Sequence, residues 1–142
     1  MKKYIAVKIV DAEPMSAALA EHHLERKVDV SNAKMSETGE TGYPGYLIEY
    51  PDGFRSWCPK KQFEDANRPT DGLSFGLTQE AALKGFGFRL PFWKEDVVVR
   101  IMTPDDGGEM TAPYFYVTSR FGMVPWIPTI IELFSNSWII VE

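Results

Sequence analysis

Residues 46–57 read Tyr46-Leu47-Ile48-Glu49-Tyr50-Pro51-Asp52-Gly53-Phe54-Arg55-Ser56-Trp57. Two short runs rich in aromatic residues flank a turn in which Pro51 fixes φ and Gly53 accepts the positive φ that tight turns require. The run therefore predicts a β-hairpin. Because proline suits the first turn of a helix, Pro59 indicates a helix over residues 60–66 directly after the hairpin.

Upstream of the hairpin, the pattern predicts one strand, one helix and a loop. Residues 4–10 are rich in β-branched side chains, so we expect a strand there that has ended by Pro14. Residues 15–26 are good helix formers, and residues 28–40 are polar without any period, as in a loop. The helix is expected to present one apolar face, formed by Met15, Ala18, Leu19 and His22.

Turn-forming residues divide the chain near its middle. The stretch Asn67-Arg68-Pro69-Thr70-Asp71-Gly72 separates two patterned segments, so we interpret residues 67–72 as a linker. The 142 residues, 44% of them hydrophobic, suffice for one ordinary core or two small ones. We therefore expect a β-α-β-β-α module over residues 1–66 and a second domain over residues 73–142.

The second domain reads as a helix followed by strands. Ser74 is placed to cap a helix over residues 75–84, with Gly85 at its end and Phe75, Leu77, Ala81 and Leu83 apolar. Strands are expected over residues 86–90, 97–102, 114–119 and 138–141, a hairpin turn over 105–108, and a short helix over about 129–134. The predicted fold class is α+β, with two small modules of mostly antiparallel pairing.

Charge and cysteine content exclude several classes of function. The net charge of −5 argues against nucleic-acid binding, which depends on Lys and Arg. The lone Cys58 cannot form an intrachain disulfide and fits a reducing compartment. His22 and His23 are adjacent, so on a helix they point about 100° apart and do not make a metal site. No apolar run is long enough to span a membrane, and a cytoplasmic protein is expected.

Aromatic side chains at element ends predict a protein that holds a small planar ligand without converting it, since no set of catalytic groups is evident. The candidate rings are Phe92, Trp93, Tyr114 and Tyr116, and the candidate cations, left as alternatives, are Arg89, Lys94, Arg100 and Arg120. Tyr114 and Tyr116 share one strand face and Phe115 the other, so only one set can line a site, and the tyrosines are favoured. Trp126 and Trp138 lie in apolar surroundings and are expected in the core.

Binding strength then argues for an oligomer. Stacking on one ring contributes roughly 1–3 kcal/mol, whereas nanomolar capture needs about 12 kcal/mol. A rigid pocket enclosed between subunits can supply the difference, because preorganised contacts lose little entropy.

Several spaced residues of the second half carry a family resemblance. They are Phe75-Gly76, Ala81-Ala82-Leu83-Lys84, Arg89, Trp93, Val124-Pro125-Trp126, Glu132-Leu133-Phe134 and Trp138. In this spacing the C-terminal half resembles the second Thoeris anti-defence family of phage sponge proteins. The first half is similar to another small phage-encoded module, recognisable in residues 12–15, 45–50 and 56–60, whose role is not settled.

The resemblance implies a function without catalysis. Members of that family oligomerise, generally as tetramers, and sequester glycocyclic ADP-ribose signals; some also hold cyclic dinucleotides. It implies a non-enzymatic sponge without cofactor or metal, acting in the host cytoplasm, with Thr129 added to the ligand-binding residues as the hydroxyl after Pro125-Trp126. The alternative is a phage accessory module that binds another protein through its aromatic surface.

Overall fold

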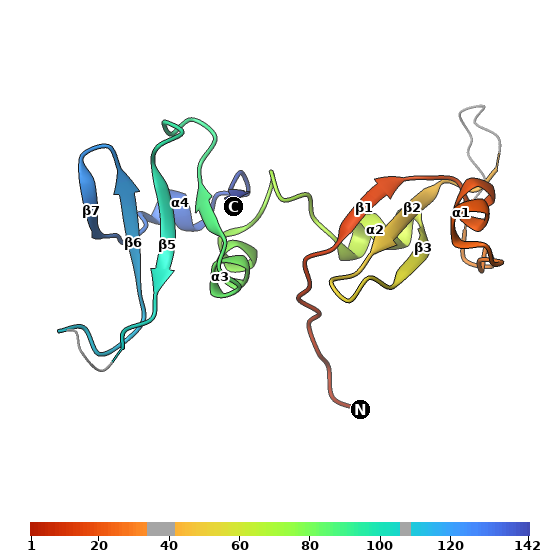
Figure 1. The fold of residues 1–142 in the computed structure, drawn as a ribbon, viewed down its shortest axis with the longest axis horizontal. Helices are drawn as coiled ribbons and strands as arrows, with labels where there is room; N and C mark the ends of the chain where they lie inside the picture. Colours follow the sequence, from red (N-terminus) through yellow and green to blue (C-terminus); the bar gives the residue numbers. More distant parts are fainter. Residues whose placement is uncertain (34–41, 106–108) are drawn as a thin grey trace. The chain divides into compact units, whose positions relative to one another are not determined.

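The computed structural model describes residues 1–33, 42–105 and 109–142, and the chain forms two compact units, Met1–Asn67 and Arg68–Glu142 (Figure 1). Each unit has its own sheet, of three and of five strands, and every strand pair described is antiparallel. The predicted α+β class is confirmed. No helix in the described ranges is long and apolar enough to cross a membrane.

The first unit is a three-stranded sheet with two helices. Its elements are β1 (Asp11–Pro14), α1 (Ala17–Leu24), β2 (Gly45–Glu49), β3 (Arg55–Pro59) and α2 (Lys60–Ala66), and the strand order is β1-β2-β3 (Figure 1). The predicted hairpin and the helix after it are confirmed. In the hairpin turn, Tyr50 N–H donates to the carbonyl of Phe54 at 2.9 Å, and Gly53 has a φ of 85°.

Both faces of this sheet are covered by helices. Leu47 and Trp57 form a core with α1, and the Trp57 indole Nε1–H donates to the Met15 carbonyl at 2.8 Å. On the opposite face, Tyr46 stacks on Phe63 of α2 with ring centroids 4.2 Å apart. The alternation of side chains along β2 thus sends one set to each helix.

Two predictions for this unit are wrong in detail. Residues 4–10 do not form the expected strand, and the first strand begins at Asp11. Because β2 ends at Glu49, where the hairpin turn starts, residues upstream of Asp11 have no partner strand. In α1, Ser16 caps the helix, and the inward residues are Ala17 and Ala20, while Ala18 and Leu19 are exposed. Small side chains face inward because the bulky Leu47 and Trp57 fill that core.

The second unit is a five-stranded sheet with two helices. Its elements are α3 (Phe75–Leu83), β4 (Gly87–Arg89), β5 (Val98–Met102), β6 (Tyr114–Ser119), β7 (Gly122–Pro125), α4 (Ile130–Leu133) and β8 (Ile139–Val141), and the strand order is β7-β6-β5-β4-β8 (Figure 1). The chain therefore crosses from one edge of the sheet to the other between β7 and β8.

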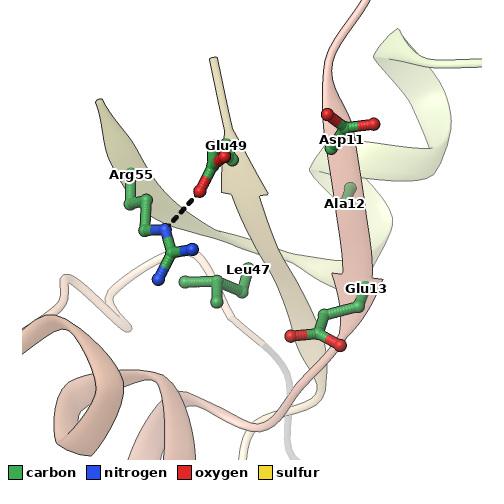
Figure 2. Close-up of a pocket in the computed structure, with 6 residues that line it drawn as sticks. All are labelled: Asp11, Ala12, Glu13, Leu47, Glu49 and Arg55. Carbon is green, nitrogen blue, oxygen red and sulfur yellow. Dashed lines mark hydrogen bonds and ion pairs between the residues drawn. The ribbon is translucent and has the colours of Figure 1, made fainter. Parts of the chain in front are cut away.

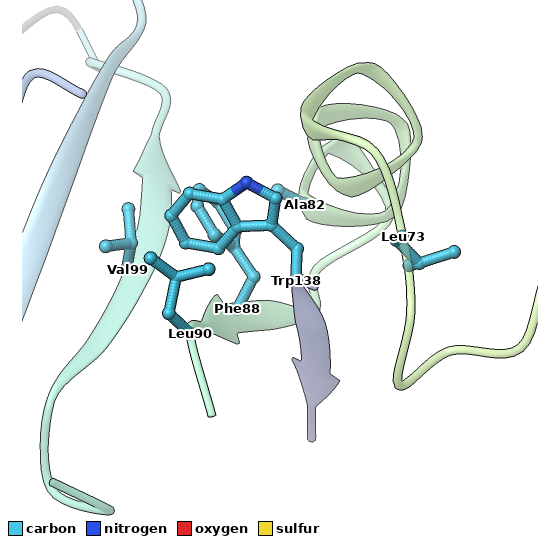
Figure 3. Close-up of a cluster of buried hydrophobic side chains, with 6 residues drawn as sticks. All are labelled: Leu73, Ala82, Phe88, Leu90, Val99 and Trp138. Carbon is cyan, nitrogen blue, oxygen red and sulfur yellow. The ribbon is translucent and has the colours of Figure 1, made fainter. Parts of the chain in front are cut away.

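The core of the second unit is dominated by rings on one side of the sheet. We call the set Phe75, Phe88, Trp93, Phe115, Trp126 and Trp138 the aromatic cluster; its rings contact one another at centroid distances of 5.3–6.3 Å. Trp138, drawn among the buried side chains in Figure 3, is fully buried, and its Nε1–H donates to the Glu132 carbonyl of α4 at 3.0 Å. The expected core placement of Trp138 is confirmed, and Trp126 packs against the core half-buried.

The ends of α3 agree with the prediction from the sequence, but the predicted set of buried residues is partly wrong. The Ser74 hydroxyl accepts the Leu77 N–H, and Gly85 follows with a φ of 98°. However, Leu83 is 62% exposed, and the fully buried position is Thr78, whose hydroxyl donates to the Ser74 carbonyl at 2.9 Å. That internal bond lets a polar residue occupy the inner face.

The sequence prediction missed β7. The strands expected from the sequence do not include Gly122–Pro125, yet this segment pairs with β6. Pro125 is compatible with a strand here because β7 is an edge strand, where a missing N–H need not break the ladder. Most of the turn expected over residues 105–108 and of the loop over 28–40 lies outside the described residues.

Hydrogen bonds at the junction attach Asn67 to the first unit and Thr70 to the second. The Asn67 N–H and side-chain amide both donate to the Phe63 carbonyl at the end of α2. The Thr70 carbonyl accepts the Ile140 N–H at 2.9 Å, and Leu73 pairs with Trp138. The segment before α3 is therefore attached to the outer edge of β8.

Candidate functional site

The five-stranded sheet has one face that neither helix of its own unit, α3 or α4, covers. Because side chains alternate, the residues between members of the aromatic cluster point to the opposite side. We call this side the open face; it carries Val98, Arg100 and Met102 of β5 opposite Thr118, Tyr116 and Tyr114 of β6. Both α3 and α4 contact the aromatic cluster instead.

Arg100 lies across the open face over a glycine. Its Nη1–H donates to the Gly85 carbonyl at 3.4 Å, and its Nη2–H donates to the backbone oxygen of Glu142 at 3.0 Å. A Cβ at Gly87 would lie 3.0 Å from Arg100 Cζ and 2.6 Å from Val98 Cγ1. The missing side chain of Gly87 therefore leaves space for the guanidinium.

Sequence reasoning named Arg100 as a possible cation but missed Gly87. A glycine inside a strand often marks a close approach of other groups, and that was the available signal. The signal could not say which group approaches, because Arg100 meets Gly87 only once β4 and β5 have paired.

A second guanidinium lies on the same face. Arg89 is one strand away from Arg100, and its Nη1–H donates to the Trp93 carbonyl at 3.1 Å. Within residues 42–105 and 109–142, neither arginine forms an ion pair with a carboxylate side chain. Tyr116 stands directly opposite Arg100, and Tyr114 follows two residues earlier on the same face. The open face thus combines two cations with two phenol rings.

The structure brings together three of the six predicted ligand-binding residues. Arg89, Tyr114 and Tyr116 share the open face. Phe92 is 80% exposed in the turn between β4 and β5. Thr129 caps α4: its hydroxyl accepts the Glu132 N–H at 3.2 Å, and its own N–H donates to Glu132 Oε2 at 2.9 Å.

Trp93 lies on the other side of the sheet from the two tyrosines. It is half-buried, and its ring contacts Trp138 edge-on at 5.5 Å and Trp126 at 6.1 Å. Within one chain, the ring of Trp93 and those of Tyr114 and Tyr116 therefore cannot enclose the same ligand.

The histidines and the cysteine of the first unit lie apart from any site of this kind. His22 and His23 are exposed, and no group of three or more His, Cys, Asp or Glu side chains in the described part of the chain is arranged to hold a metal ion. Cys58 is half-buried, and burial raises the pKa of its thiol.

The first unit also has a hollow of about 330 Å³ on the α1 side of its sheet. Its charged lining is Asp11, Glu13, Glu49 and Arg55, and Figure 2 shows the Arg55 guanidinium reaching toward Glu49, with which it forms an ion pair. Three carboxylates against one guanidinium make this hollow suitable for a cation and unsuitable for an anionic nucleotide.

Comparison with known proteins gives no match: neither a protein-family model nor a curated protein is similar to this chain.

Proposed function

We propose that the chain binds a cyclic nucleotide immune signal on the open face of its second unit, without converting it. The ligand class is glycocyclic ADP-ribose, with cyclic dinucleotides as the related possibility, and the consequence is sequestration of a signal of bacterial anti-phage defence in the host cytoplasm. The resemblance of the C-terminal half to the second Thoeris anti-defence family supplies the ligand class.

The observation that carries this proposal is the position of Arg100. Its guanidinium donates to two backbone oxygens and has no carboxylate side chain as a partner among the described residues, so its charge is available to a phosphate. Tyr116 directly opposite offers a ring on which a base can stack. Arg89 adds a second positive charge for the other phosphate of a diphosphate.

One open sheet face does not account for tight capture. A second subunit that covers the open face would exclude water and add contacts, which is how an interface reaches nanomolar affinity. A homo-oligomer, a tetramer by the family resemblance, is therefore part of the proposal. Further subunit contacts of the oligomer can use apolar side chains around α4, where Ile127, Ile131 and Phe134 are each more than 80% exposed.

Isothermal titration calorimetry with glycocyclic ADP-ribose isomers and cyclic dinucleotides tests the proposal. We expect Arg100→Gln to weaken binding by about ten- to a hundredfold, the loss expected when a charged hydrogen-bonding group is removed. Arg120→Gln is the matched control, because Arg120 lies in the β6–β7 turn with its guanidinium over Phe121. Absence of heat with every ligand, or equal losses in both variants, would rule the proposal out.

A mass measurement on released ligand separates binding from catalysis. Protein loaded with a signal and then denatured should return the ligand at unchanged mass. A ligand of altered mass would identify an enzyme instead.

The exposed apolar residues around α4 favour a second function, a module that binds another protein. Between Ile127 and Phe134 the only charged side chain is Glu132, which is engaged in the α4 cap. If this is the function, Ile131→Asp should abolish partner binding, whereas Arg100→Gln should leave it unchanged. A pull-down that recovers the same partner with wild type and Arg100→Gln but not with Ile131→Asp would favour it.

A further inference from the structure

The first segment of the first unit is exposed; it has the composition of a strand but does not pair with any described strand. We call residues 2–10 the N-terminal arm; Tyr4 is 83% exposed and Ile5 is 90% exposed. Lys8 Nζ lies 5.2 Å from the ring centroid of Tyr50, at the end of β2. Odd positions of the arm carry Ile5, Val7 and Ile9, the pattern of a strand with one apolar face.

The outer edge of β1 is open to pairing. β1 is the outermost strand of its sheet, and no strand in the described ranges pairs with its other side. Met15 N–H donates to the Gly45 carbonyl, so odd residues of this segment direct their backbone groups toward β2 and even residues direct theirs outward. Pro14, which has no N–H, is at an outward position, as expected for an edge strand.

We propose that the N-terminal arms and β1 strands of two copies pair antiparallel across a two-fold axis at Val7. The two three-stranded sheets then join into one sheet of six strands. In this register, Lys3 of one copy is opposite Asp11 of the other, Tyr4 is opposite Val10, and Ile5 is opposite Ile9. Each of these three pairs joins opposite charges or two apolar side chains, which are the favourable cross-strand combinations.

Neighbouring registers are worse. A two-fold axis at Lys8 would place two lysines opposite each other and Ile5 opposite Asp11. An axis at Ala6 would place Lys3 opposite Ile9. A register that pairs odd with even residues would place Lys8 opposite Ile5 or Val7, and it would not match the outward backbone groups of the even residues with one another. The charges and the apolar pattern therefore both favour a two-fold axis at Val7.

Charge complementarity extends beyond the paired strands. Asp11 and Glu13 line the acidic hollow of Figure 2, in which three carboxylates accompany one guanidinium. Lys3 of a second copy would reach the rim of this hollow next to Asp11. Lys3 of a second copy thus adds a positive charge beside the three carboxylates of the hollow, and the paired arms that bring it there are self-complementary.

Cysteine cross-linking on the full chain tests the register. In a Cys58→Ser background, Val7→Cys should give a covalent dimer on mild oxidation, because facing odd residues are the closely spaced pairs with Cα atoms about 4.5 Å apart. Ile5→Cys alone should cross-link at least tenfold less, and a mixture of Ile5→Cys with Ile9→Cys should cross-link as well as Val7→Cys. Equal cross-linking by all three, or none by Val7→Cys, would overturn the proposal.

A charge exchange gives an independent test that needs no ligand and is separate from the proposed nucleotide binding. Lys3→Glu and Asp11→Lys each place like charges opposite each other twice per dimer, so analytical ultracentrifugation should show dimerisation weakened by roughly tenfold in each. Mixing the two variants restores both opposite-charge pairs and should restore the dimer. The proposed pairing is wrong if the mixture dimerises as weakly as its components. It is also wrong if wild type does not dimerise, or if its dimer persists in Val7→Asp.

Discussion

The two sheets of this protein are covered differently. In the first unit, α1 and α2 lie on opposite faces, so both faces are used for packing and the unpaired backbone groups are at the outer edges of β1 and β3. In the second unit, α3 and α4 both contact the aromatic cluster, so one face is left open. Antiparallel sheets tolerate both arrangements. The first unit is thus suited to binding through an edge, and the second through a face.

The largest expected effect is a loss of stability on removing a ring from the aromatic cluster of the second unit. Trp138→Ala removes a fully buried ring that contacts four others, and it should lower the free energy of unfolding by roughly 3–5 kcal/mol. Urea denaturation followed by circular dichroism measures this. Phe121→Ala, at an 86% exposed ring, is the control and should change stability by less than about 0.5 kcal/mol.

The next effect tests the packing of the first sheet. A Cβ at Gly45 would overlap both the Cys58 carbonyl oxygen and the Trp57 ring, so Gly45→Ala should destabilise by about 3 kcal/mol. Gly76→Ala is the contrasting variant, because no atom beyond its chain neighbours and its own helix backbone lies within 4 Å of the position that its Cβ would take, and an alanine suits the helix α3. A gain of about 0.5–1 kcal/mol is expected there. Thermal unfolding that ranks the two otherwise would contradict the described packing.

A pair of tyrosines compares a covered face with the open one directly. Tyr46 stacks on Phe63 and its hydroxyl donates to Glu64 at 2.9 Å, so Tyr46→Ala should cost about 2 kcal/mol. Tyr116 has no described helix over it, and Tyr116→Ala should cost less than about 1 kcal/mol. Both variants are compared in chemical denaturation at concentrations where the chain is monomeric, and equal losses there would contradict the described open face; equal losses only at higher concentration would indicate a second subunit over it.

Variants of Thr129 distinguish a helix-capping role from a ligand contact. Thr129→Ala removes both halves of the α4 capping box and should destabilise by about 1 kcal/mol. Thr129→Ser keeps the hydroxyl and should be close to wild type. If either variant changed nucleotide affinity more than stability in matched titrations, Thr129 would be a ligand residue in addition to a cap.

The smallest effect is a pH dependence. The Arg120 N–H donates to Asp96 Oδ2 at 2.9 Å and lowers the pKa of Asp96 below its ordinary value of 3.8. A lowered native pKa contributes stability above the unfolded value, and this contribution is lost as the pH falls through the native value. Wild type should therefore exceed Asp96→Asn in stability at neutral pH, with the gap closing below about pH 4. A gap that widens in acid would contradict the bond.

Much of the local structure could be predicted, whereas the candidate site could be predicted only in part. Ser74, Gly85 and the turn at Gly53 act within a few residues of chain, so their patterns were sufficient. The alternation of Tyr114 and Tyr116 with Phe115 limited each face to one set of rings. It could not say that Trp93 joins the rings of Trp126 and Trp138.

The sequence by itself determined the α+β class, the hairpin and the helix caps, because these depend on near neighbours and on side-chain period. Only the tertiary structure decided that residues 4–10 have no partner in their own sheet, that β8 lies beside β4, and that Arg100 rests over Gly87. Each of these depends on pairing between segments far apart in the chain. Such pairing is selected by the burial of whole faces, which no single stretch of sequence contains.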